Sequence, residues 1–161
     1  MGNIIRPTQE QLKGPFGDFN YDIKNEKSYI AIANGIVWEE IVSLLLLDSK
    51  NDKMYERLES ISNAKLRGNV TRSNLASGCS KIIEKQFDLI TNDEYISIIN
   101  AFSYTRTQSL MMLVKPDISS EIYQENLELL TIMDLIFLYN DEFNVLVQKY
   151  GFCDTRTMRF I

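Results

Sequence analysis

Apolar residues recur at helical spacing along most of the chain after residue 33. The stretch "NGIVWEEIVSLLLLDS" is apolar on most faces, so we predict that it forms the central buried helix, with Asn34 as its N-cap. Thr91 and Glu94 have the spacing of a capping box, and Gly151 marks a C-terminal stop. The pattern predicts an all-α protein, a single compact bundle of five to six helices. The expected helices cover 34–49, 52–66, 72–90, 91–114, 117–139 and 140–150.

The first 30 residues follow neither a helical nor a strand period. They hold two of the three prolines and three of the seven glycines. The aromatic residues Phe16, Phe19 and Tyr21 are scattered there among polar residues, as in a segment that docks on another surface. We therefore predict an extended N-terminal arm over 1–30, a helical domain over 31–152 and a C-terminal tail over 153–161.

Length and composition fit one globular domain. A chain of 161 residues, 45% apolar and 24% charged, can bury a core without disulfides or metals. Its net charge of −5 disfavours nucleic acid and anionic lipid as partners. The N-terminus has no apolar signal core, and the most apolar segments, 41–47 and 127–139, are too short to span a bilayer. We expect a protein that is not secreted and has no membrane contact, located in the cytoplasm or within a virus particle.

Several chemistries lack the residues they need. The chain has no histidine, which removes histidine-based catalysis and histidine metal ligands. Cys79 and Cys153 are far apart, and no glycine-rich phosphate loop is present. Cys79 lies on an apolar stripe and is expected to be buried, whereas Cys153 is expected to be more exposed. We predict no enzymatic activity, no cofactor, no metal and no small-molecule substrate.

Carboxylates leave one chemical option open. Glu121, Glu125 and Glu128 lie at helical spacing, so one helix face could hold a divalent ion. No second acidic helix shows a matching pattern. The sequence therefore favours a solvated acidic face, which Asp117 extends.

Arg106 interrupts an apolar stripe between Phe102 and Leu110. If its guanidinium is buried, it needs a partner, and Asp134, Glu128 or an acid of a neighbouring subunit could serve. The alternative is a side chain that extends to solvent from the end of a short stripe. The sequence leaves both interpretations open.

Charge is divided into two blocks. Residues 65–85 hold five basic residues and one acidic residue, a net charge of +4, whereas 117–142 hold seven acidic residues and no basic one. Opposite blocks of this kind set orientation when proteins associate. They could pair within one chain or between copies, and the sequence leaves this open. The residues of the basic patch are Lys65, Arg67, Arg72, Lys81 and Lys85, with Lys81 and Lys85 expected on an exposed face.

These features predict a non-enzymatic structural or adaptor subunit that forms a homo-oligomer or a larger assembly with protein partners. The 19 isoleucines and 13 asparagines are typical of AT-rich coding sequences, so a phage or virus particle is one expected setting. A small helical regulator that binds a host or cellular protein is the alternative. A nucleic-acid-binding module using 65–85 is disfavoured, because its basic residues are not interleaved with aromatic ones.

Overall fold

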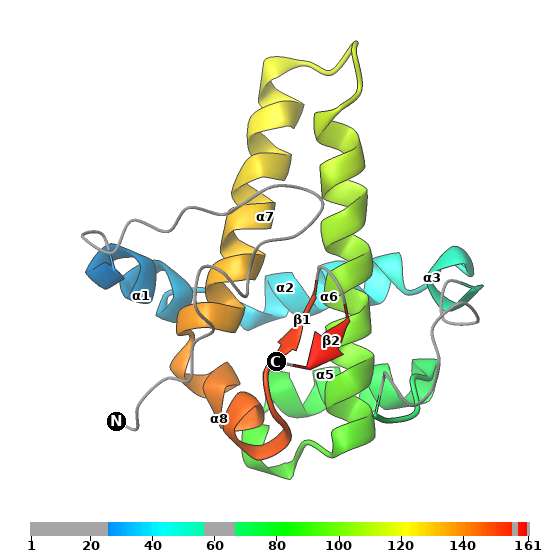
Figure 1. Ribbon diagram of the computed structural model, residues 1–161, viewed down its shortest axis with the longest axis vertical. Helices are drawn as coiled ribbons and strands as arrows, with labels where there is room; N and C mark the ends of the chain where they lie inside the picture. The colour runs from blue at the N-terminus through cyan, green and yellow to red at the C-terminus, as the bar shows by residue number, and fades with distance from the viewer. Residues whose placement is uncertain (1–25, 57–66, 156–157, 161) are drawn as a thin grey trace.

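The computed structural model describes residues 26–56, 67–155 and 158–160, and its regular elements are helices apart from one short pair of strands (Figure 1). The all-α prediction is confirmed. Phe16, Phe19, Tyr21 and Lys65 lie outside the described residues. The elements in chain order are α1 (Glu26–Asn34), α2 (Trp38–Asp48), α3 (Lys53–Glu56), α5 (Arg72–Ile83), the 3-10 helix η3 (Phe87–Leu89), α6 (Asn92–Leu113), α7 (Ser120–Tyr139), α8 (Asp141–Tyr150), β1 (Cys153–Asp154) and β2 (Arg159–Phe160).

Helix α6 is the centre of the bundle. Every residue from Glu94 to Arg106 is buried, because α2, α5, α7 and α8 all pack against this part of the helix. The prediction that the helix within 34–49 would be the central one is wrong. In α2, one face is buried through Trp38, but Leu47 on another face is 62% exposed.

Aromatic side chains join the helices around Phe143 of α8. Its ring lies 4.6 Å from that of Phe137 and 6.1 Å from that of Phe102. The Trp38 ring is 6.3 Å away on another side, and Trp38 also contacts Phe87 at 5.4 Å. Aromatic contacts of this kind stabilise a fold by more than the area that they bury, and here they join α2, α6, α7 and α8.

Helix ends follow the capping chemistry of the sequence in most places. Thr91 and Glu94 form the predicted capping box of α6, and Gly151 ends α8 with φ of 98°. Asn34, however, is the last residue of α1, and α2 begins after Val37 without a side-chain cap. The helical part therefore starts at Glu26, inside the segment predicted as the arm.

The expected helix over 72–90 is interrupted. Helix α5 ends at Ile83, and Lys85 takes a positive φ of 60° before η3 begins. That left-handed residue turns the chain so that Phe87 enters the core, where it is 5% exposed.

The C-terminal residues fold back onto the helices. Strands β1 and β2 pair antiparallel, with Cys153 opposite Phe160. Cys153 is 1% exposed, so the expectation that it would be the more exposed cysteine is wrong. The Tyr95 hydroxyl donates to the carbonyl of Gly151 at 2.9 Å, which places the start of this segment on α6.

Among the described residues, no single helix is long and apolar enough to cross a membrane. Helices α1 and α2 reach that length and composition only together, and they are bent by 74° relative to each other.

Candidate functional site

The described basic residues of 65–85 are held by carboxylates and a ring on other elements. Lys81 Nζ lies 2.7 Å from Glu94 Oε1, so Lys81 is half-buried and not on the exposed face predicted for it. Lys85 Nζ is 3.8 Å from a Glu142 carboxylate oxygen. Lys85 is on the exposed face, as predicted, and the other two are exposed as well. The Arg72 guanidinium pairs with Asp52, and that of Arg67 stacks 4.4 Å above the Phe160 ring.

The loop before α5 uses its backbone donors within the chain. The Asn69 amide donates to Asp93 Oδ1 at 2.9 Å, and the Asn74 amide donates to the Thr71 hydroxyl at 3.0 Å. Gly68 lies so close to α6 that an added Cβ would be 2.9 Å from Asn92 Nδ2. These contacts occupy two of the backbone donors that a phosphate would need, so the local geometry favours packing over anion binding.

Glu94 is the best-connected carboxylate of this region. Its burial alone would raise its pKa, but hydrogen bonds from Lys81, Ser77 and Thr91 outweigh this and lower the pKa to about 2. The side chain is 4% exposed and joins α5 to the first turn of α6. The arrangement keeps Glu94 ionised, which fits a structural ion pair better than a proton-transferring acid.

Burial also decides the state of the two thiols. It raises the pKa of Cys79 to about 12 and, with the nearby Asp154 carboxylate, raises that of Cys153 to about 12. Both cysteines are free and buried. Neither thiol has the exposure and the low pKa that a reactive cysteine needs.

The structure buries Arg106 and does not extend it to solvent. Its guanidinium Nε donates to Asp134 Oδ1 at 3.2 Å across the α6–α7 interface. Asp134 is one of the partners that the sequence suggests, whereas Glu128 is exposed. This charge pair fixes one helix against the other within the core.

The predicted acidic residues lie at the far end of the α6–α7 hairpin. We call residues 111–125, which contain the turn between the two helices, the hairpin end. Figure 1 shows the α6–α7 hairpin projecting beyond the other helices. Asp117, Glu121, Glu125 and the adjoining Glu128 are all exposed and make no ion pair with any described residue.

Exposed apolar residues accompany these acids. Val114 is 81% exposed and Met111 is 57% exposed, at the end of α6. Across the turn, Tyr123 is 43% exposed and Ile122 is 40% exposed. The hairpin end thus presents exposed apolar side chains next to exposed carboxylates. The described residues contain no group of three or more acidic, cysteine or histidine side chains that could hold a metal ion.

The hairpin end and the described residues of the basic patch lie at opposite ends of the molecule. Helix α5 packs against the first turns of α6, because Gly78 lies next to Glu94 and Ile98. The hairpin end is at the other end of this 22-residue helix, roughly 25–30 Å away. In the described part of the chain, Lys85 and Glu142 form the one ion pair between the two charge blocks.

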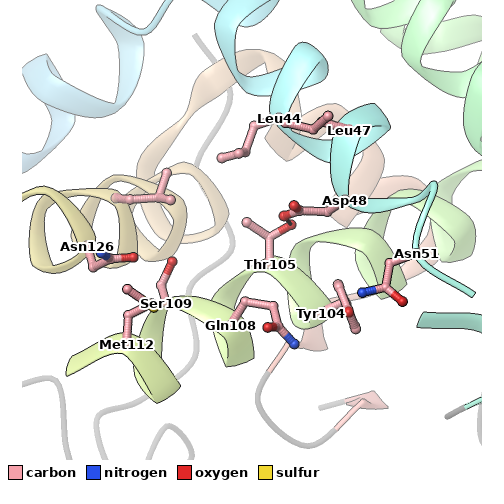
Figure 2. A pocket seen from close by; sticks show the side chains of 11 residues that line it. Leu44, Leu47, Asp48, Asn51, Tyr104, Thr105, Gln108, Ser109, Met112 and Asn126 are labelled. Atoms are coloured by element: carbon pink, nitrogen blue, oxygen red, sulfur yellow. Dashed lines mark hydrogen bonds between the residues drawn. The ribbon is translucent and has the colours of Figure 1, made fainter. Parts of the chain in front are cut away.

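A cavity of about 460 Å³ lies between α2, α6 and α7 (Figure 2). Asp48 at the end of α2 accepts a hydrogen bond from the Thr105 hydroxyl at 2.7 Å inside it. Other polar lining residues are Asn51, Gln108, Ser109 and Asn126, and apolar walls come from Leu44, Leu47, Met112 and Leu129. No pattern in the sequence indicates this cavity, because three separate segments line it and none contains a recognisable motif.

Comparisons of the chain with models of known protein families, with curated proteins and with solved structures find no match.

Proposed function

We propose that this protein is a non-enzymatic assembly subunit whose hairpin end docks onto the basic patch of a second copy. The observation that carries the proposal is the hairpin end itself. There, exposed Met111, Val114, Ile122 and Tyr123 lie beside the acidic residues of α7.

Charge complementarity favours a second copy as the occupant. Arg67 and Arg72 lie at the start of α5 and Lys85 follows its end, and all three stay exposed in spite of their contacts within the chain. The acids of the hairpin end are too far from them to pair within one chain. A contact between copies would join two different surfaces. Such heterologous contacts form rings when the rotation between copies closes, and filaments when it does not.

The proposal predicts an assembly that salt weakens, because exposed charges are screened beyond about 8 Å at physiological ionic strength. Sedimentation velocity at low and high salt measures this. A protein that remains a monomer at every concentration and both salt conditions contradicts the proposal.

Charge exchange gives a sharper test. The variant with Glu121→Lys and Glu125→Lys should fold but not assemble, and so should the variant with Arg72→Glu and Lys85→Glu. All four side chains are exposed. Mixing the two variants should restore assembly, because each altered surface then meets an opposite charge on the other variant.

Glu39→Lys with Glu40→Lys is the matched control, since both residues are exposed on α2 outside the two surfaces. This control should assemble like the wild type. If the mixture stays monomeric while wild type assembles, the two surfaces do not contact each other and the proposed docking is wrong.

A further inference from the structure

We propose that the cavity between α2, α6 and α7 binds a cationic group on a short aliphatic stem, such as an alkylguanidinium or alkylammonium ion. This site is separate from the hairpin end and does not depend on assembly. Its volume of about 460 Å³ lies within the range of small-ligand sites.

The charge of the lining selects the sign of the ligand. Among the described residues that line the cavity, Asp48 is the one charged residue, and none is a lysine or an arginine. Thr105 binds its Oδ2, and its Oδ1 accepts no hydrogen bond from a described residue. Asp48 is also the last residue of α2, where the carbonyl ends of the helix favour a cation.

Two further groups provide acceptors for a hydrogen-bonding cation. Ser109 is 4% exposed, and in Figure 2 its hydroxyl points into the space below α2. This hydroxyl makes no hydrogen bond to a described side chain, so it is available as an acceptor for a ligand in the cavity. Asn126 donates its Nδ2 to the carbonyl of Ile122 at 2.8 Å, so its Oδ1 is left as an acceptor.

The apolar walls of the cavity are the reason for proposing an aliphatic stem on the cation. Leu44, Met112 and Leu129 are half-buried around the polar groups, and Leu47 at the edge is 62% exposed. A bare ion would leave these side chains in water. An alkyl chain would cover them, while its cationic end reaches Asp48.

Calorimetric titration with butylguanidinium tests the site. We expect saturable binding to the wild type, at least tenfold weaker binding of butylurea, and no binding of valerate. Asp48→Asn should weaken butylguanidinium binding at least tenfold, because it removes the charge but keeps an acceptor for Thr105. Glu40→Gln, an exposed acid on the same helix, should bind like the wild type.

A second arm separates the two sources of such a cation. A blocked Ala-Arg-Ala peptide that binds at least tenfold more tightly than butylguanidinium indicates an arginine of a partner protein, and equal or weaker binding indicates a free ligand. The proposal is overturned if butylguanidinium shows no saturable binding, if butylurea binds equally well, or if Asp48→Asn binds it unchanged. None of these outcomes bears on the docking of the hairpin end.

Discussion

Arg106 shows how a single buried charge can fix two helices. Its side chain is 4% exposed and that of Asp134 is 11% exposed, so both charges have left most of their water. Removing one partner leaves the other charged in the core, which is far more costly than the pair itself.

We therefore expect Arg106→Met to lower the free energy of unfolding by about 3–5 kcal/mol. Adding Asp134→Leu should recover most of this loss, since no unpaired charge then remains. Urea denaturation measures both variants. The exposed pair of Arg72 and Asp52 provides the control, and Arg72→Met should cost no more than about 1 kcal/mol. A double variant as unstable as Arg106→Met would show that the pair has a further structural role.

Glu94 makes stability depend on pH. Its pKa in the folded protein is about 2, below the ordinary value of 4.5. A carboxyl with a lowered pKa stabilises the fold above its unfolded-state pKa, and this contribution is lost as the pH falls through the folded-state pKa. We expect Glu94→Gln to be about 3 kcal/mol less stable than the wild type at pH 7.

The difference between wild type and Glu94→Gln should shrink as the pH falls from 4.5 towards 2. Denaturation at several pH values measures it, with Glu84→Gln as the control because Glu84 is exposed. A difference that stays constant over this range would show that ionisation of Glu94 is not its source.

What the sequence predicts at this scale depends on how local the interaction is. The capping box joins Thr91 and Glu94, which are three residues apart, so the local sequence is sufficient to predict it. The pairing of Glu94 with Lys81 needs the packing of α5 on α6, which spacing within one helix does not reveal. Arg106 is intermediate: its place in an apolar stripe predicts a partner but does not choose one.

At the scale of elements, α5 and α6 approach closely at Gly78. A Cβ there would lie 2.9 Å from Ile98 Cδ1 and 3.2 Å from Glu94 Cβ. Glycine inside a helix costs about 1 kcal/mol relative to alanine, so close packing is the physical reason for this residue.

Gly78→Ala should consequently destabilise the protein by about 1–3 kcal/mol in spite of the better helix propensity. Thermal unfolding measures this change. Ile98→Val should relieve part of the loss by removing the Cδ1 atom. On the exposed face of the same helix, Ser80→Ala should be neutral or slightly stabilising, and a similar gain from Gly78→Ala would contradict the packing argument.

The joint between α1 and the α7–α8 corner was not predictable from helical periodicity. Asn140 caps α8 through the Phe143 amide at 2.7 Å and also donates to the Ala33 carbonyl at 2.7 Å. In the opposite direction, Asn34 Oδ1 accepts a hydrogen bond from the Asp141 amide at 2.9 Å. Two asparagines more than 100 residues apart thus hold the end of α1 in place, and the local pattern at Asn34 resembled an N-cap instead.

At the scale of the whole molecule, burial divides α6 into two parts. Its residues from Glu94 to Arg106 are core, whereas the residues after Ser109 are at least partly exposed. The same division appears in α7, whose buried residues begin at Leu130. The sequence predicted both helices and the charge contrast, but not that one shared end would project. That arrangement depends on how far the neighbouring helices extend, which no local pattern records.

The two buried cysteines can serve as built-in probes of local opening in two parts of the fold. Cys79 lies in the core on α5 and Cys153 lies in the C-terminal strand pair, so a thiol reagent reaches each one only when its surroundings open. The C-terminal pair consists of two-residue strands and should open more readily than the bundle. Pulsed alkylation followed by mass spectrometry would then resolve two rates in the unaltered chain, a faster one at Cys153 and a slower one at Cys79.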